Sequence, residues 1–463
     1  MNGTPMRLAG AGRIVGVVPT PAPCRLTLED DRFEVAVTGA APIIAAYRDL
    51  TALTVQPGAA LVVLGEERDA VRIVLEQFGE HLGTIVQELR ERRTRSRLRD
   101  AFVELPDDEP LEIAEYRLGS EHGVAQLGIG RWGAELVPLD ERLAWRRLRR
   151  AEISVVSADR SSGSVLVERT APLESGTGEP PARLELLGLG AAVERWAERL
   201  AGLRDAALRD AAALIAGLVP DAPFGTRQRL GRLLVDGRPA AIAGLGDDGP
   251  LLDAAVLTEP VFATSLRALL VRAGEPPLRW FALAPERPGT DRRMAWHLVA
   301  LPGNLLALEL VSTGAHATYL FRVVPRATYD GARPEAMAPA VEAAVREISA
   351  ALIDARFLRE PIALPAERLA LASHLRYRLA LAALPTLAAA RRRFVARLVH
   401  DDPARWTAAL NDLMAWHAAA RDEAAEWPGR AAEERAVAAA SAGQDDLAGT
   451  NSGAGPVSGA RTD

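Results

Sequence analysis

The chain has 463 residues and a formal net charge of −6, and 49% of its residues are hydrophobic. This balance is typical of a globular protein with about three domains, and it excludes a global positive field that would attract nucleic acid. All 55 basic residues are arginine, which excludes enzyme classes that need a lysine for a Schiff base or for phosphate binding. The single cysteine, Cys24, excludes an internal disulfide framework and a cysteine-rich metal site, and it fits a reducing, cytoplasmic compartment.

Residues 1–23 are predicted to form a separate N-terminal segment. Residues 6–23 are mildly apolar and end just before Cys24, as a lipoprotein signal would, but Arg13 interrupts the apolar run. No stretch is apolar and long enough for a membrane span, because the best candidate, 298–311, is broken by Pro302-Gly303-Asn304. That tripeptide predicts a hairpin turn between two strands.

The first folded unit is predicted over residues 24–105. Short alternating runs favour two strands around a turn at 29–32, and further strands follow as far as residue 75. An amphipathic helix from about Glu76 then closes the unit. Its apolar residues step by four, three and four, and so share one face: Phe78, Leu82, Ile85 and Leu89.

The second unit, over residues 111–220, repeats this design after a Pro- and Asp-rich linker at 106–110. Its strand signals lie between residues 124 and 187. Its closing helix carries the same kind of apolar face: Leu189, Val193, Trp196, Leu200 and Leu203. When the units are laid side by side, residues 47–55 match residues 148–156 in pattern.

The rest of the chain is predicted to hold a helical connector (221–277), a third β-plus-helix unit (278–356), a helical pair (357–427) and a disordered tail (428–463). Four strands are expected in the third unit. Its helix has apolar residues at the same spacing: Val341, Val345, Ile348 and Leu352. In the helical pair, Pro385 is expected to kink a long first helix over 366–400, and the second helix is expected at 404–426.

The repetition determines the predicted fold class. We expect an α+β protein made of tandem small antiparallel β-barrel or sandwich units, each capped by a C-terminal helix, plus a C-terminal helical pair. Whether residues 278–356 form a full third repeat is left open.

A small twisted barrel or sandwich closed by a C-terminal helix resembles the pleckstrin-homology-like superfold. The resemblance is clearest over 24–99 and 111–210, and 278–355 is a weaker match. The one residue that supports it is Trp196, because such domains often carry a tryptophan at this position of the closing helix. The resemblance implies two uses. One is phosphoinositide binding by a basic turn between the first two strands. The other is protein binding at strand edges or in the groove beside the helix.

The turn that would bind the lipid is identified as Glu29-Asp30-Asp31-Arg32 in the first unit, and in the second unit only Arg131 is available. A lipid phosphate needs several clustered donors. The protein-binding use is therefore preferred.

One segment, Gly128-Ile129-Gly130-Arg131-Trp132-Gly133, fits the dinucleotide fingerprint letter for letter. That fingerprint needs a helix to start within it, whereas the following residues, 134–138, favour a strand. A glycine-rich β-turn is the preferred interpretation.

The histidines suggest no metal site. His297 and His316 are placed on neighbouring strands and could face each other, but no third ligand lies at a suitable spacing. His374, His400 and His417 are dispersed along the predicted helices. We expect partly buried or surface histidines and no cofactor.

Clusters of arginine are the remaining candidates for a site. Two of them form a possible patch for an anionic partner: Arg92, Arg93, Arg95, Arg146, Arg147, Arg149 and Arg150. A third cluster is Arg391-Arg392-Arg393 with Arg397. Carboxylates flank or interleave these clusters, so a solvated, salt-bridged face is preferred over a binding patch.

These observations favour a non-catalytic binding or scaffold protein whose partner is another protein. A peripheral membrane binder that uses the arginine clusters is the first alternative, and an enzyme of unrecognised type is the second. A clustered arginine surface would favour the membrane, whereas a deep pocket with converging polar groups would favour the enzyme.

Overall fold

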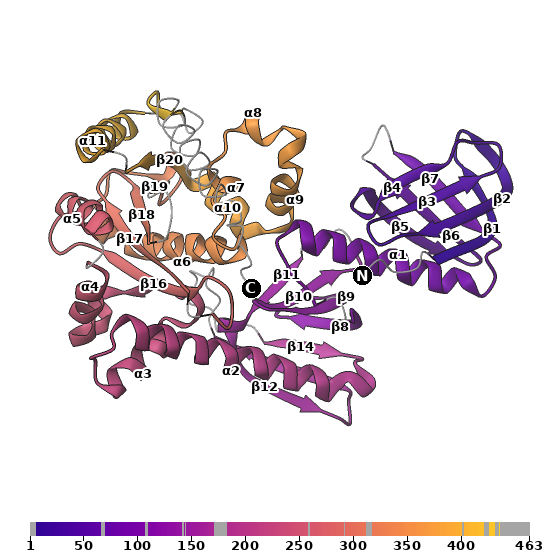
Figure 1. Ribbon diagram of the computed structural model, residues 1–463, viewed down its shortest axis with the longest axis horizontal. Coiled ribbons are helices and arrows are strands. Elements are labelled where there is room, and N and C mark those ends of the chain that lie inside the picture. Colours follow the sequence, from indigo (N-terminus) through magenta and orange to yellow (C-terminus); the bar gives the residue numbers. More distant parts are fainter. Residues whose placement is uncertain are drawn as a thin grey trace, which may run out of the picture.

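The described part of the chain is an α+β protein with antiparallel sheets of seven, seven and six strands. The molecule is elongated, and the first unit projects from one end (Figure 1). The computed structural model describes residues 6–65, 70–106, 110–140, 143, 145–170, 183–257, 260–290, 292–311, 317–400, 402–420, 426–430 and 435. The predicted disordered tail and the loop at 171–181 lie almost entirely outside these residues.

The first sheet has the strand order β4-β3-β2-β1-β7-β6-β5. Its strands are β1 (Met6–Ile14), β2 (Val18–Leu28), β3 (Arg32–Val37), β4 (Ile43–Ala46), β5 (Leu50–Gln56), β6 (Ala59–Leu64) and β7 (Val71–Glu76). A 3-10 turn, η1 (Tyr47–Asp49), joins the two edge strands, and helix α1 (His81–Asp100) covers the sheet. The sheet is not closed into a barrel, because among the described residues its edge strands β4 and β5 do not pair.

The structure corrects the predicted start of this unit. The expected boundary at residue 24 falls inside β2, and β1, which belongs to the supposed separate segment, lies in the middle of the sheet. Glycines concealed the strand: a Cβ at Gly10 would lie 2.7 Å from the Phe78 ring, and one at Gly12 would lie 3.0 Å from Cys24 Sγ. Phe78 is buried under β1 and precedes α1, so it does not belong to the helix face as predicted.

The second sheet has the order β11-β10-β9-β8-β14-β13-β12, which matches the first strand for strand. Its strands are β8 (Glu112–Leu118), β9 (Glu121–Gly130), β10 (Gly133–Pro138), β11 (Arg146–Arg149), β12 (Ile153–Asp159), β13 (Ser164–Arg169) and β14 (Leu184–Leu187). Two 3-10 turns, η3 (Arg150–Glu152) and η4 (Gly190–Ala192), and helix α2 (Val193–Leu218) complete it. The predicted repeat is confirmed at the level of strand order.

The structural alignment of the two repeats is shifted by two residues from the alignment that the sequence pattern predicts. The strands after the 3-10 turns, β5 and β12, each have seven residues and begin at Leu50 and Ile153. The sequence match of 47–55 with 148–156 instead placed Leu50 opposite Ala151. Asp49 and Glu152, the last residues of the two 3-10 turns, are therefore equivalent.

The core of the second unit contains Trp196, which is 2% exposed. The otherwise aliphatic helix face predicts that Trp196 is the most buried aromatic residue of the unit, and this prediction is wrong because Tyr116 on β8 is 0% exposed. The Tyr116 hydroxyl donates a hydrogen bond to Glu121 Oε1 at 3.0 Å. That bond allows a phenol to occupy the core position.

The third sheet is a simple meander that runs from β15 to β20 in chain order. Its strands are β15 (Ala240–Ala241), β16 (Arg279–Pro285), β17 (Arg293–Leu301), β18 (Leu305–Val311), β19 (Ala317–Arg322) and β20 (Phe394–Val399). The four predicted strands are confirmed. The strand order differs from that of the first two sheets, and the edge strands come from the predicted connector and helical pair, so this unit is not a full third repeat.

Helices cover both faces of the third sheet (Figure 1). One face packs against α6 (Ala338–Asp354) and α10 (Pro385–Arg393). The other packs against the C-terminal half of α2 and the helices α3 (Phe224–Leu233), α4 (Gly249–Val256), α5 (Pro260–Ala273) and α11 (Pro403–Ala419). The predicted face of α6, with Val341, Val345, Ile348 and Leu352, is buried as expected. The 3-10 turns η5 (Val235–Gly237) and η6 (Ile242–Asp248) lie between α3 and α4.

The segment between α6 and α11 differs from the predicted helical pair. Three helices and a strand occupy the range 366–400 of the expected long helix, and the helices are α8 (Ala366–Leu369), α9 (Leu375–Ala383) and α10; a further short helix, α7 (Glu360–Ala363), precedes them. Pro385 does not kink a helix but occupies the first position of α10, where its missing N–H costs no hydrogen bond. After Arg393 the chain becomes β20, and its buried residues complete the sheet.

Candidate functional site

The first arginine cluster fastens α1 to its own sheet. Arg92 donates from Nε to Glu88 Oε2 at 3.0 Å and from Nη1 to the Glu29 carbonyl oxygen at 2.6 Å. Arg93 donates to the Thr51 carbonyl oxygen at 2.7 Å, and Arg95 pairs with Glu91. These guanidinium groups are occupied by internal contacts, so the structure does not form the suggested patch from them.

The second cluster lies on β11 and η3, where the second unit meets the third. Arg146 is the most exposed of the four, with 38% of its side chain accessible, and it binds Glu121 through Nε and Nη2. The side chains of Arg147, Arg149 and Arg150 are at most 8% exposed. The prediction of a solvated face is wrong for these three.

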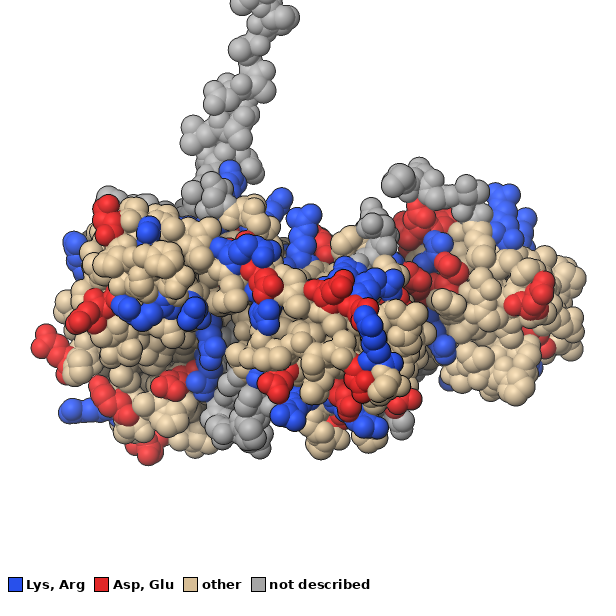
Figure 2. All heavy atoms as spheres, turned by 90° about the horizontal axis from the view of Figure 1, so that it is seen from below, with Lys and Arg blue, Asp and Glu red and all other residues tan. Residues whose placement is uncertain are grey.

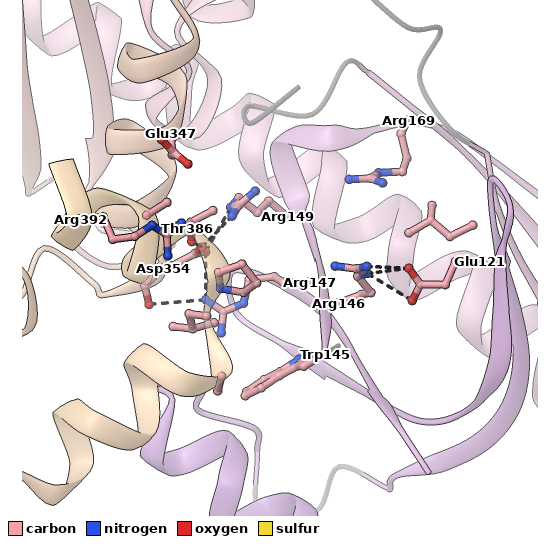
Figure 3. A pocket seen from close by; sticks show the side chains of 15 residues that line it. Glu121, Trp145, Arg146, Arg147, Arg149, Arg169, Glu347, Asp354, Thr386 and Arg392 are labelled. Atoms are coloured by element: carbon pink, nitrogen blue, oxygen red, sulfur yellow. Dashed lines mark hydrogen bonds and ion pairs between the residues drawn. The ribbon is translucent and has the colours of Figure 1, made fainter. Parts of the chain in front are cut away.

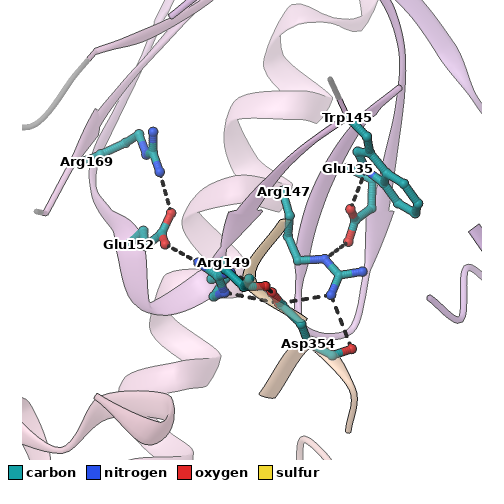
Figure 4. A network of polar contacts seen from close by, with 8 residues as sticks. Glu135, Trp145, Arg147, Arg149, Glu152, Arg169 and Asp354 are labelled. Atoms are coloured by element: carbon teal, nitrogen blue, oxygen red, sulfur yellow. Dashed lines mark hydrogen bonds and ion pairs between the residues drawn. The ribbon is translucent and has the colours of Figure 1, made fainter. Parts of the chain in front are cut away.

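Arg147 and Arg149 converge on Asp354, the last residue of α6 (Figure 4). Arg149 donates from Nη2 to Oδ2 at 2.6 Å and from Nε to Oδ1 at 3.1 Å, and Arg147 donates from Nη1 to Oδ1 at 3.0 Å. Thr386, at the start of α10, donates its hydroxyl to Oδ2 at 2.6 Å. One carboxylate therefore joins the second unit to two helices of the third.

Further carboxylates satisfy the other sides of these arginines. Glu135 accepts from Arg147 Nε at 2.6 Å and from Trp145 Nε1 at 2.9 Å. Glu152 accepts from Arg149 Nη1 at 2.8 Å and from Arg169 Nη2 at 2.7 Å. Figure 4 shows how these residues form one continuous network between strands of the second unit and the end of α6.

Arg150 forms a second buried connection. It donates from Nε and Nη2 to the two carboxylate oxygens of Asp236 at 2.9 and 2.7 Å, and its Nη1 lies 2.8 Å from Asp210 Oδ2 on α2. Its guanidinium carbon lies 5.2 Å from the centroid of the Trp132 ring. Asp236 has a φ of 52°, a left-handed conformation that presents its side chain to Arg150.

Asp354 is electrostatically the best stabilised carboxylate of the network. Its burial alone would raise its pKa, but the adjacent Arg149 and Arg147 outweigh burial, and the pKa is lowered to about 2. At Asp236, burial prevails over Arg150 and the pKa is raised. Because a buried ion pair must overcome a large desolvation cost, the intact network adds little net stability, whereas removal of one partner would leave a buried charge uncompensated.

Beside this network lies a cavity of about 480 Å³ (Figure 3). One wall comes from the second unit and the other from α6, the end of α9 and α10. Its polar lining consists of Glu121, Trp145, Arg146, Arg147, Arg149, Arg169, Glu347, Asp354, Thr386 and Arg392. The remaining lining is apolar: Leu118, Ala383, Leu384, Pro385 and Ala389. A cavity of this size between two structural units is typical of a small-molecule site.

The charges around this cavity are unequal. Among the described residues, the five guanidinium groups that line it share only four carboxylates, because the fifth nearby carboxylate, Glu347, pairs with Arg393. The described residues give the Arg392 side chain no hydrogen bond or ion pair. The described lining contains no histidine, cysteine or serine.

The other sequence candidates do not join this site. Residues 128–133 form the β9–β10 hairpin, with Gly130 opposite Gly133, so the preferred β-turn is confirmed. His297 is fully buried with its ring 5.0 Å from that of Phe281, and burial lowers its pKa to about 3. Its expected neighbour, His316, lies outside the described residues. Within the part that the structure describes, no group of three or more histidine, cysteine or carboxylate side chains could hold a metal ion.

The acidic half of the network was missed by the sequence analysis. Asp354 ends a helix whose preceding five residues are all buried, and Asp236 follows the buried pair Leu234-Val235. A carboxylate inside an apolar run was the available signal, since such a residue is rarely buried unless it is paired.

The surface itself is mixed in charge. In the view of Figure 2, acidic and basic side chains alternate over the body, and the lower part of the first unit, at the right, carries few charges. Among the helices described, none combines the length and apolarity that a membrane span requires. The chain matches no protein-family model and no curated protein.

Proposed function

We propose that this chain is a non-catalytic binding or scaffold protein, in which pleckstrin-homology-like units mediate contacts with a protein partner. The observation that carries the proposal is the contrast between the two repeats. The second unit is fixed to the third by buried ion pairs, whereas the first unit projects from the body (Figure 1). A projecting unit on a rigid base is a suitable arrangement for presenting a docking surface.

The first unit also has an apolar tip. Its first hairpin turn is Val15-Gly16-Val17, in which both valines are more than half exposed. Val15 donates its backbone N–H to the Arg72 carbonyl oxygen, which brings it close to the exposed Val71. Clustered exposed valines favour contact with a protein.

This hairpin replaces the turn at 29–32 as the one between the first two strands, since 29–32 joins β2 to β3. The equivalent turn in the second unit is Gly119-Ser120. Neither turn carries a basic residue. Phosphoinositide binding in the manner of the family is therefore not supported, and protein binding remains the better use of the fold.

The proposal is tested by affinity capture from the native host, followed by mass spectrometry. A double variant, Val15→Ser with Val17→Ser, is compared with Val271→Ser, which alters a residue on α5 that is 82% exposed. We expect a specific partner that the hairpin variant loses and the control retains. A partner set unaffected by the hairpin variant, or lost equally with Val271→Ser, would contradict the assignment of the docking surface to the first unit.

A further inference from the structure

We propose that the cavity between the second unit and helices α6 and α10 binds a small organic anion, a carboxylate or a phosphate ester with an apolar body. This is a ligand site separate from the protein-docking surface on the first unit. Three features support it: the size of the cavity, its unequal charges and two guanidinium groups whose hydrogen-bonding capacity is incompletely used.

The first of these groups is Arg169, on β13. Its side chain is only 10% exposed, its Nη2 donates to Glu152, and its Nε is buried without a hydrogen-bond partner. A buried N–H of a charged group that lacks an acceptor carries a desolvation cost. An anionic oxygen in the cavity would relieve that cost.

The second group is Arg392, on α10. Among the described residues no carboxylate accepts from its side chain, although Arg393 next to it pairs with Glu347. Figure 3 places Arg392 and Arg169 on opposite sides of the cavity, with Arg147, Arg149 and Asp354 between them. Because guanidinium groups bind carboxylate and phosphate oxygens in pairs, two of them facing one space form a clamp for an anion.

The wall of the cavity between Arg169 and Arg392 also favours a negatively charged ligand. The N-terminus of α10, at Pro385 and Thr386, lines the cavity and adds the positive end of a helix dipole. Arg147 and Arg149 are held in place by Asp354, Glu135 and Glu152, so they contribute a fixed positive field. The apolar lining, including Leu118 and Leu384, would contact the body of the ligand.

The surplus of charge limits the ligand's class. One guanidinium group around the cavity lacks a carboxylate of its own. A ligand with one or two negative charges would therefore balance the surplus of positive charge. A cation is not expected in this cavity, because the carboxylates Glu121 and Asp354 in its lining are already paired with arginines.

The experiment is titration calorimetry on the full chain at constant ionic strength. The probes are phenyl phosphate and benzoate, with benzyl alcohol as the uncharged comparison. We expect both anions to bind at millimolar concentration or below and the alcohol not to bind. Arg392→Gln should weaken binding about tenfold, the usual effect of losing one charge-assisted hydrogen bond.

Two further variants separate the cavity from general charge effects. Ala383→Phe fills the cavity without changing the charge and should abolish binding. Arg287→Gln removes an exposed arginine in the turn between β16 and β17 and should leave the affinity unchanged. In a second measurement, phenyl phosphate should protect Arg392 from modification by phenylglyoxal, as read by mass spectrometry of the wild-type protein.

Several results would overturn the proposal: no binding of either anion, equal binding of benzyl alcohol, or affinity that Arg392→Gln and Ala383→Phe leave unchanged. Vesicles containing phosphatidic acid separate a free ligand from a lipid headgroup. Vesicle binding that depends on Arg392, without any binding of soluble phenyl phosphate, would replace the small-ligand site by a membrane contact.

Discussion

Arg149 and Asp354 are bound to each other through two hydrogen bonds, of 2.6 and 3.1 Å, although 205 residues separate them in the chain. The side chains are 4% and 2% exposed. This pair is the centre of the contact between the second repeat and the third sheet. The stability of that contact depends on whether each charge keeps its partner.

Replacing Asp354 by Asn should lower the free energy of unfolding by about 3–5 kcal/mol, because it leaves Arg147 and Arg149 buried with an uncompensated charge. The matched control is Arg146→Gln, which breaks the half-exposed pair with Glu121 and should cost less than about 1 kcal/mol. Urea unfolding of both variants measures the difference. Equal, small losses would contradict a structural role for Asp354.

The same carboxylate predicts a loss of stability in acid. A carboxyl group whose folded pKa is about 2, below its ordinary value of 3.8, stabilises the fold above pH 4 and loses this contribution as the pH falls through 2. The loss for this group amounts to about 2 kcal/mol. Between pH 5 and pH 2, the free energy of unfolding should therefore fall more steeply with decreasing pH in the wild type than in Asp354→Asn. If the free energies of unfolding of the two proteins fell in parallel with pH, a group other than Asp354 would be responsible for the loss of stability in acid.

Trp196 anchors α2 to the second sheet. Its replacement by Ala should cost about 3–5 kcal/mol, the usual loss for a core aromatic residue. As a comparison, Tyr116→Phe keeps the ring of the more buried residue and removes one hydrogen bond to Glu121, at a cost of about 1 kcal/mol. A change below roughly 1 kcal/mol for Trp196→Ala would mean that this face does not support the core.

The purified protein should not sediment with anionic liposomes at physiological salt. Each uncompensated arginine near such a surface contributes only about 1 kcal/mol, and the two candidate clusters are paired internally. Replacing Arg147, Arg149 and Arg150 would disturb the fold, so Arg146→Gln is the informative variant for that cluster. Salt-sensitive sedimentation that Arg146→Gln abolishes would support the membrane alternative. Sedimentation lost only when Arg92, Arg93 and Arg95 are replaced would move the contact to α1.

The sequence was informative wherever apolar spacing reported directly on burial. It predicted the capping helices, the four central strands of the third sheet and the repeat of the first two units. It could not fix the alignment of the repeats, because side chains alternate along a strand with a period of two. A shift of two residues keeps every side chain on the same face, so the pattern was equally good in both alignments.

Two other errors have different physical causes. β1 was missed because Gly10 and Gly12 leave space for Phe78 and Cys24 instead of contributing apolar side chains of their own. The arginines at 147–150 were placed in solvent because flanking carboxylates indicated local pairing. Their main partners, Asp354 and Asp236, lie far along the chain, and contacts of that kind leave no periodic signal.

The long sequence separation of Arg149 from Asp354 also affects the order in which parts of the chain can fold during translation. The first repeat contains all the strands and the helix that it needs within its first hundred or so residues, and can fold as soon as they emerge. The contact between the second repeat and the third unit must wait for a carboxylate that is made 205 residues later, a delay of about 10–40 seconds at ordinary elongation rates. During that interval Arg147 and Arg149 lack Asp354, whereas Arg150 gains Asp236 only 86 residues after its own synthesis. In a nascent chain halted between residues 240 and 350, the arginine-rich edge of the second repeat should therefore be more protease-sensitive than in the full chain, while the first repeat should be equally resistant in both.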